Sequence, residues 1–195
     1  MASRPLAARV AALPLRWMGI GAGVLALGVS GLAGGLDPVA APGLPQVRPS
    51  ELSAGGPWNV TVLTGRLVAD LSPIKPEHEG DRWFILLAKV ENTDTESRAD
   101  AITTVRVSNV DGLVTDKPSH LLLARDGTEV NYLNPGMPEV VGYVWEQRAD
   151  AKLPTSVDVE IWGYTHRISS LNGHLEWLER SPRAMVHAPV QDRRS

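Results

Sequence analysis

The chain has 195 residues, a formal net charge of −3 and no cysteine. The lack of cysteine excludes disulfides and a lipid-modified cysteine anchor, so the fold must depend on its hydrophobic core. All 22 acidic residues lie from Asp37 onward with 16 of the 19 basic ones, which gives this part a charge of −6. Such an acidic balance argues against nucleic acid as a partner, because phosphate binding needs a basic surface.

The N-terminal segment predicts a membrane anchor. Residues 1–16 carry Arg4, Arg9 and Arg16 without an acidic residue, and residues 17–36 carry no charge. As a helix the uncharged run would span roughly 30 Å, and the leading positive charge would keep the N-terminus in the cytoplasm. We therefore expect a cytoplasmic basic leader at residues 1–16 and one transmembrane helix at residues 17–36. This prediction places the chain in the cell membrane, with the remainder outside the cytoplasm.

A cleaved signal peptide is the alternative interpretation of the same segment. Residues 20–29 would form its apolar region, and Gly31-Leu32-Ala33 resembles a small-residue cleavage site. The long leader and the apolar character up to Leu36 favour an uncleaved anchor, whereas cleavage would release a secreted form. The Gly-x-x-x-Gly spacings in this segment are typical of helix pairing but arise easily in a glycine-rich run, so homo-oligomerisation is left open.

Residues 37–57 predict a Pro/Gly-rich stalk, because this stretch has five prolines and little bulk with which to build a core. From Trp58 onward, short runs of β-forming residues alternate with turn residues. Seven strands are expected, at residues 58–71, 82–92, 102–109, 120–124, 129–132, 140–146 and 157–167. Among the turns between them, Asn134-Pro135-Gly136 is expected to require a positive φ at Gly136.

This spacing of short strands predicts an all-β sandwich over residues 58–180, outside the cytoplasm. A short helix is expected at residues 171–180, at the end of this domain. Residues 181–195, with two prolines and a polar end, predict a flexible tail.

Two strand patterns suggest an interaction surface. Residues 82–92 are apolar on both faces of a two-residue repeat, which predicts a central strand covered on both sides. Residues 157–167 alternate, with Val157, Val159 and Ile161 expected to point inward. The opposite faces would then carry large aromatic side chains toward solvent, where such groups often anchor a partner. The candidate interaction surface consists of Trp83, Tyr143, Trp145, Trp162 and Tyr164.

The alternative is that the C-terminal apolar residues Leu171, Leu175, Trp177 and Leu178 fold back and cover this aromatic surface within the molecule.

The order GDRWFILLAKVENT (residues 80–93) and LARDGTEVNYLNPGMPEVVGYVWE (residues 123–146) resembles bacterial exported, membrane-anchored immunoglobulin-like domains of unknown function. The matching positions are turn and core residues, namely Gly80, Val90, Asn92, Asp126, Gly127, Pro135 and Gly136. The resemblance implies an immunoglobulin-like β-sandwich of about seven strands behind one N-terminal transmembrane helix. It brings no catalytic residues, and this chain lacks the lipidated cysteine that anchors some of those domains.

No motif for catalysis, a cofactor or a metal stands out. The chain has no Gly-x-Ser-x-Gly, and its histidines lack the spacing of a zinc site. The cluster Glu77-His78-Glu79-Gly80-Asp81 offers oxygen ligands for a hard cation such as Ca²⁺ but matches no complete loop motif, which favours a solvated loop. We therefore expect no catalytic residue, no cofactor and no metal site.

The expected function is a non-catalytic interaction or accessory module of the cell envelope, for example in a transporter assembly, with an envelope protein as partner. The alternative is a secreted or envelope enzyme of hydrolase type, whose site is assembled only in three dimensions.

Overall fold

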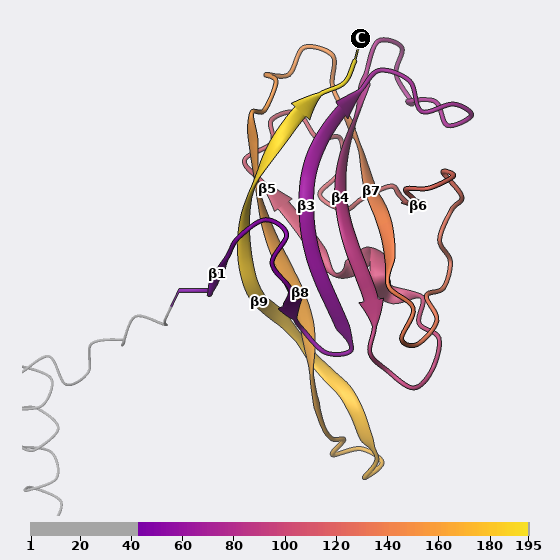
Figure 1. Cartoon of the computed structure of the whole chain (residues 1–195), viewed down its shortest axis with the longest axis vertical. Coiled ribbons are helices and arrows are strands. Elements are labelled where there is room, and N and C mark those ends of the chain that lie inside the picture. Colours follow the sequence, from indigo (N-terminus) through magenta and orange to yellow (C-terminus); the bar gives the residue numbers. More distant parts are fainter. Residues whose placement is uncertain (1–42, 195) are drawn as a thin grey trace, which may run out of the picture. The chain divides into compact units, whose positions relative to one another are not determined.

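The computed structural model describes residues 43–194 (Figure 1). The predicted leader, transmembrane helix and first part of the stalk (residues 37–42) lie outside the described residues. Across residues 43–194, no helix is both long enough and apolar enough to cross a membrane. The described elements are strands apart from a 3₁₀ helix, η1 (Asp100–Thr103), so the predicted all-β class is confirmed.

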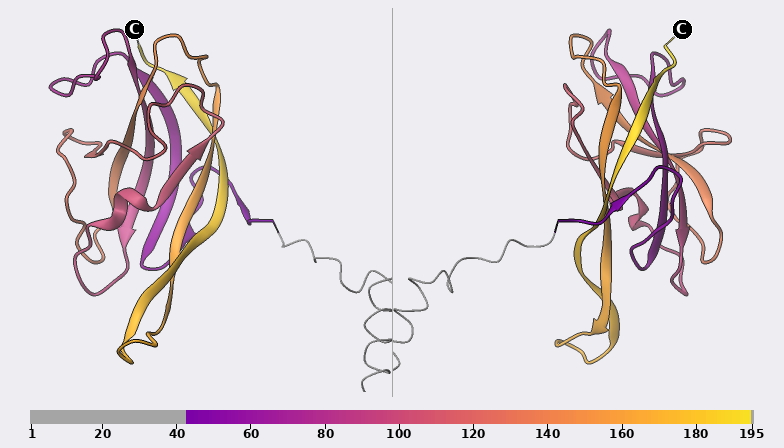
Figure 2. Two further views of the ribbon diagram at one scale, coloured as in Figure 1. Left: turned by 180° about the vertical axis from the view of Figure 1, so that it is seen from behind. Right: turned by 60° about the vertical axis from the view of Figure 1, so that its left-hand side comes forward.

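The strands form two facing sheets (Figure 2). Their bounds are β1 (Gln46–Val47), β2 (Ser53–Ala54), β3 (Trp58–Val68), β4 (Arg82–Asn92), β5 (Val105–Ser108), β6 (His120–Leu123), β7 (Glu139–Gln147), β8 (Ser156–Ile168) and β9 (Leu175–Asp192). One sheet has the order β2–β3–β4–β7–β6, and the other has the order β5–β8–β9–β1. The sheets meet where the end of β9 pairs in parallel with β3, at Gly65↔Val190. The predicted β-sandwich is thus confirmed.

Alternate side chains of both sheets fill the space between them, because the side-chain period of a strand is two. Fully buried core residues include Trp58, Phe84, Leu86, Val141, Tyr143, Trp145, Val157, Val159, Ile161 and Val186. Strand β4 has the predicted bounds, and its other face packs Trp83 into a second cluster with Leu122 and Val144. Leu71 and Ile74 from the β3–β4 connection cover this second cluster. The prediction that β4 is covered on both faces is confirmed.

The predicted helix at residues 171–180 is wrong, because these residues form a turn and the first part of β9. Leucines at residues 171, 175 and 178 have a helical spacing, but Asn172-Gly173 between them is a strong hairpin signal. Gly173 has a φ of 74°. Ser169 N–H donates to the carbonyl of His174 at 2.8 Å and closes the hairpin between β8 and β9.

The predicted tail and the described part of the predicted stalk are also wrong, since both belong to the sandwich. Strand β9 continues to Asp192 and buries Ala184, Val186 and Ala188. Residues 46–47 pair with β9, and residues 53–54 pair with β3. The prolines in both segments obscured this pairing in the sequence. The two prolines of β9 are tolerated because β9 has a complete antiparallel partner only on its β8 side.

Two smaller corrections concern the middle of the chain. The predicted strand at residues 129–132 is reduced to an isolated bridge, Leu122↔Glu129. The predicted strand at residues 102–109 begins inside η1, and only β5 forms a ladder there.

Gly136 has a φ of 65°, as the turn chemistry predicted, and a Cβ built on it would meet no atom within 4 Å. A substitution there is therefore opposed by the backbone conformation alone. Gly136→Val should lower the free energy of unfolding by about 1 kcal/mol or more, because a β-branched residue resists positive φ. Gly136→Asn should cost less, because asparagine tolerates this region. Denaturant unfolding measures both, and equal stability of the two variants would contradict this account.

Candidate functional site

Three of the five predicted surface aromatics are in the interior. Tyr143 and Trp145 are fully buried between the sheets, where the Tyr143 hydroxyl lies 2.6 Å from that of Thr104. Burial raises the pKa of Tyr143. Trp83 is on the outer face of its sheet as predicted, but the second cluster covers it. Alternation alone does not say which face of β7 is covered by the second sheet, so the exposure of these three residues was wrongly predicted.

Trp162 and Tyr164, the other two, are half-buried. The Trp162 ring lies between two guanidinium groups, with Arg106 Cζ at 4.1 Å and Arg180 Cζ at 4.7 Å from its centroid. Its indole N–H donates to Glu160 Oε2 at 3.0 Å. The ring is therefore partly covered by arginines within the molecule, whereas the alternative in which the C-terminal leucines cover it is wrong, because Leu171 and Leu175 are exposed. Such cation–π contacts stabilise a half-exposed aromatic in place.

Tyr164 packs against the core at the point where Arg98 approaches. Arg98 Cζ lies 5.8 Å from the Tyr164 centroid, and its guanidinium donates to carboxylate oxygens of Asp94 and Asp100 at 2.9 Å each. Burial opposes ionisation of Asp100, but hydrogen bonds and charge from Arg98 outweigh it and hold the Asp100 pKa below its usual value. The five predicted aromatics thus form no common exposed surface.

A different surface projects from the sandwich. We define the arm as residues 163–181, the part of the β8–β9 hairpin that extends beyond the other strands in Figure 1. Register shifts at Ile161/Trp162 and Gly163/Thr165 mark the place where the hairpin leaves the core. Tyr164 N–H donates to the carbonyls of Gly55 at 3.0 Å and Gly56 at 2.8 Å, which attaches the base of the arm to the domain.

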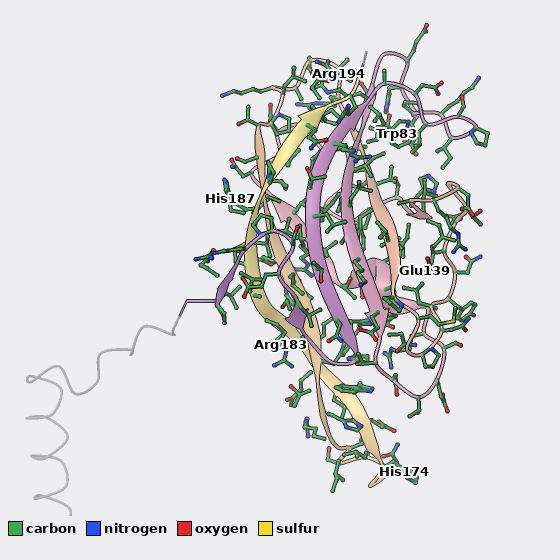
Figure 3. All side chains as sticks on the ribbon, in the orientation of Figure 1. Trp83, Glu139, His174, Arg183, His187 and Arg194 are labelled. Carbon is green, nitrogen blue, oxygen red and sulfur yellow. The ribbon has the colours of Figure 1, made fainter. Side chains whose placement is uncertain are left out.

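The end of the arm exposes three large aliphatic side chains. The exposed fractions are 65% for Ile168, 96% for Leu171 and 59% for Leu175. The turn that presents them is held by local hydrogen bonds, including His174 N–H to Asn172 Oδ1 at 2.9 Å. We call Ile168, Leu171 and Leu175 the arm tip; Figure 3 marks it by His174. The sequence had placed Leu171 and Leu175 on a helix, and only Asn172-Gly173 signalled the hairpin.

Next to the tip, the His166 and Trp177 rings stack with centroids 4.3 Å apart and an interplanar angle of 19°. They line a shallow hollow together with Arg98 and Glu176. The arm carries two arginines and two glutamates, so it has no net charge with neutral histidines. Arg167 and Glu179 pair across the arm at 2.5 Å. The tip is therefore an apolar end on a neutral, locally ordered ribbon.

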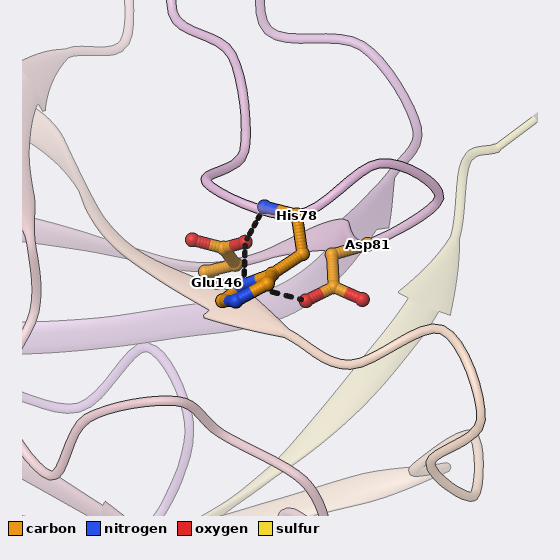
Figure 4. A group of neighbouring side chains, drawn as sticks. All are labelled: His78, Asp81 and Glu146. Atoms are coloured by element: carbon orange, nitrogen blue, oxygen red, sulfur yellow. Dashed lines mark hydrogen bonds and ion pairs between the residues drawn. The ribbon is translucent and has the colours of Figure 1, made fainter.

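A second group of polar side chains lies where the β3–β4 connection meets β7 (Figure 4). His78 and Asp81 come from the β3–β4 connection, and Glu146 comes from β7. His78 Nδ1 is 3.9 Å from Asp81 Oδ2 and 3.7 Å from Glu146 Oε1. The three candidate ligand atoms lie within 4.8 Å of one another. His78 and Asp81 belong to the acidic cluster that the sequence shows, whereas no sequence pattern connects them to Glu146, which is 68 residues from His78.

The chain matches no protein-family model and no curated protein. Among solved structures, it is similar to the crystal structure of an uncharacterized β-sandwich protein from Clostridium difficile 630. The TM-score is 0.45 at 8% sequence identity, and the match covers 78% of this chain and 97% of the other.

The base of the arm generates a stability prediction. A Cβ at Gly163 would overlap the carbonyl group of Gly55, whereas a Cβ at Gly55 would meet its nearest atom at 3.5 Å. Gly163→Ala should lower the free energy of unfolding by about 1–3 kcal/mol, because the backbone must move apart. Gly55→Ala is the matched control from the same contact and should stay close to the parent protein. Thermal or denaturant unfolding of the two variants tests the contact, and an unchanged Gly163→Ala protein would contradict it.

Proposed function

We propose that the protein is an exported, single-pass membrane protein whose immunoglobulin-like sandwich acts as a non-catalytic interaction module in the cell envelope. The uncharged segment at residues 17–36 and the arginines before it support the anchor. The strand order supports the immunoglobulin-like topology. With β3 to β9 named A to G, the sheets read A–B–E–D and G–F–C, the arrangement of a constant-type immunoglobulin domain.

The observation that carries the interaction role is the exposed arm tip. Three large aliphatic side chains at 59% to 96% exposure, at the end of one projecting hairpin, place apolar area in water. Apolar side chains gathered on a surface mark interaction sites more often than singly scattered ones do. The ordered turn also reduces the entropy that a partner would otherwise lose on fixing the loop.

The partner class follows from the charge of the arm. Anionic lipid surfaces attract segments rich in Lys and Arg, but the arm has as many glutamates as arginines. Its exposed large apolar side chains are aliphatic, whereas its two large aromatics, Tyr164 and Trp177, are half-buried and not exposed like the Trp and Tyr typical of membrane interfaces. The arm therefore fits a protein with an apolar pocket better than it fits a lipid surface. Within the envelope, such a protein would be a neighbouring exported or membrane protein.

The anchor has a direct test. The full-length chain should stay in the membrane fraction after alkaline carbonate extraction, because one spanning helix resists release. N-terminal sequencing of the recovered protein distinguishes an intact chain from a processed one. Recovery of a soluble exported form that starts near Gly34 would show that the segment is cleaved.

The arm has a test in living cells. A photoreactive phenylalanine analogue at position 171 should crosslink the full-length chain to one envelope protein, identified by mass spectrometry. Leu171→Asp should reduce co-purification of that protein by at least about tenfold, because an apolar anchor is replaced by a charge that the pocket must desolvate. The melting temperature should stay nearly constant, since Leu171 is 96% exposed.

Tyr132→Asp is the matched control, since Tyr132 is 67% exposed in the β6–β7 connection and outside the arm. It should leave the crosslinked partner bound. Crosslinks to lipid alone would assign the tip to the membrane surface, and crosslinks to a second copy would assign it to self-association. Either result would overturn the proposed partner, as would equal loss in the two variants.

A further inference from the structure

We propose that His78, Asp81 and Glu146 bind a divalent metal ion of the zinc type. The inference does not rest on the interaction role of the arm. The arm tip and the metal group lie at opposite ends of the domain. In Figure 3, His174 marks the arm tip, and Trp83 marks the metal group because it pairs with Glu146 in the β4–β7 ladder.

The fold brings the two carboxylates together from neighbouring strands. Asp81 directly precedes β4, and Glu146 is the register partner of Trp83 in the β4–β7 ladder. Asp81 is fixed by its own turn, where its backbone N–H donates to the His78 carbonyl at 3.2 Å. Asp81 Oδ1 accepts from the Ala149 N–H at 2.9 Å, which leaves Oδ2 directed toward His78. Glu146 Oε1 accepts from the backbone N–H of His78 at 3.2 Å, so both acids are held by backbone structure.

The two carboxylates are buried without an arginine or lysine partner. Their side chains are 9% exposed for Asp81 and 8% for Glu146. In residues 43–194, their only ion-pair contact is with His78. The adjacent Arg82 directs its guanidinium elsewhere, to Gln147 Oε1 and to the carbonyls of Ala149 and Ala151. Buried carboxylates with oxygens within 4.8 Å of each other repel when both are charged, and a bound cation relieves that repulsion.

His78 supplies the adjustable third ligand. Its side chain is 69% exposed, so its ring can rotate at little cost. A four-coordinate zinc ion with ligands at about 2.0–2.1 Å needs donor atoms roughly 3.3 Å apart. The distances from His78 Nδ1, 3.7 Å to Glu146 Oε1 and 3.9 Å to Asp81 Oδ2, are close to this value. Small movements of the exposed imidazole and of the carboxylate oxygens, which all lie within 4.8 Å of one another, would complete the coordination.

The donor set selects the class of metal. One imidazole nitrogen and two carboxylate oxygens suit zinc and similar transition metals, whereas Ca²⁺ needs six to eight oxygen ligands. Glu77 and Glu79 of the same loop are not part of the group, so the oxygen-rich site that the sequence suggested is not formed. A hollow of about 530 Å³ adjoins the group; besides His78 and Asp81 it is lined by Leu113, Val114, Ala149 and the charged pair Arg148 and Asp150. Water from this hollow would occupy the fourth position.

Isothermal titration of the untagged, metal-free full-length chain with Zn²⁺ tests the site. We expect one zinc ion per chain and a rise in melting temperature with zinc, because a ligand that binds the folded state stabilises it. His78→Ala should weaken zinc binding at least about tenfold and remove most of the stabilisation. Glu146→Gln should have the same effect on binding. Since His78 is largely exposed, its variant should fold even if Glu146→Gln does not.

Two matched controls separate this site from other surface groups. His187 is 64% exposed beside Asp158, and Glu79 is an exposed acid of the same loop. His187→Ala and Glu79→Gln should both leave the zinc affinity unchanged. Ca²⁺ in place of Zn²⁺ should bind much more weakly. The proposal is overturned if the chain does not bind zinc, if His78→Ala binds it as tightly as the parent, or if Ca²⁺ binds equally well.

Discussion

The pairing of β8 with β9 is the interaction on which the rest of the domain depends. This ladder runs from Ser156↔Pro189 to Ile168↔Leu175. In its first half, alternate side chains enter the core, and β9 also holds β1 and the end of β3. Beyond the register shifts at Trp162 and Gly163, the same ladder continues without a facing sheet and becomes the arm. The sandwich and its projecting surface are therefore one continuous hydrogen-bonded unit.

Much of the fold could be predicted where local pattern and final burial agree. Strand β4 is apolar on both faces, and both faces are covered. The prediction that Val157, Val159 and Ile161 of β8 point inward is also confirmed. Prediction failed where two local signals competed. A helical spacing of leucines outweighed the Asn172-Gly173 turn, and the two prolines of β9 outweighed its regular alternation of small apolar residues.

The candidate sites were harder to predict, because each depends on contacts between distant segments. The period of a strand shows that Tyr143 and Trp145 share a face, but not that the second sheet covers that face. Glu146 reaches His78 only through the register of β4 with β7. The arm tip needs the hairpin to be recognised before its leucines can be seen as exposed. In each case the missing information is long-range pairing, which a single sequence does not contain.

The two outermost strands of the sheet path, β5 and β6, have four residues each. At about 3.3 Å per residue, each offers an edge of only roughly 13 Å. A neighbouring molecule could form few backbone hydrogen bonds there, and short edge strands are one of the means by which β proteins avoid edge-to-edge aggregation. The two ends of the sheet path are therefore poor templates for strand addition by a neighbouring copy.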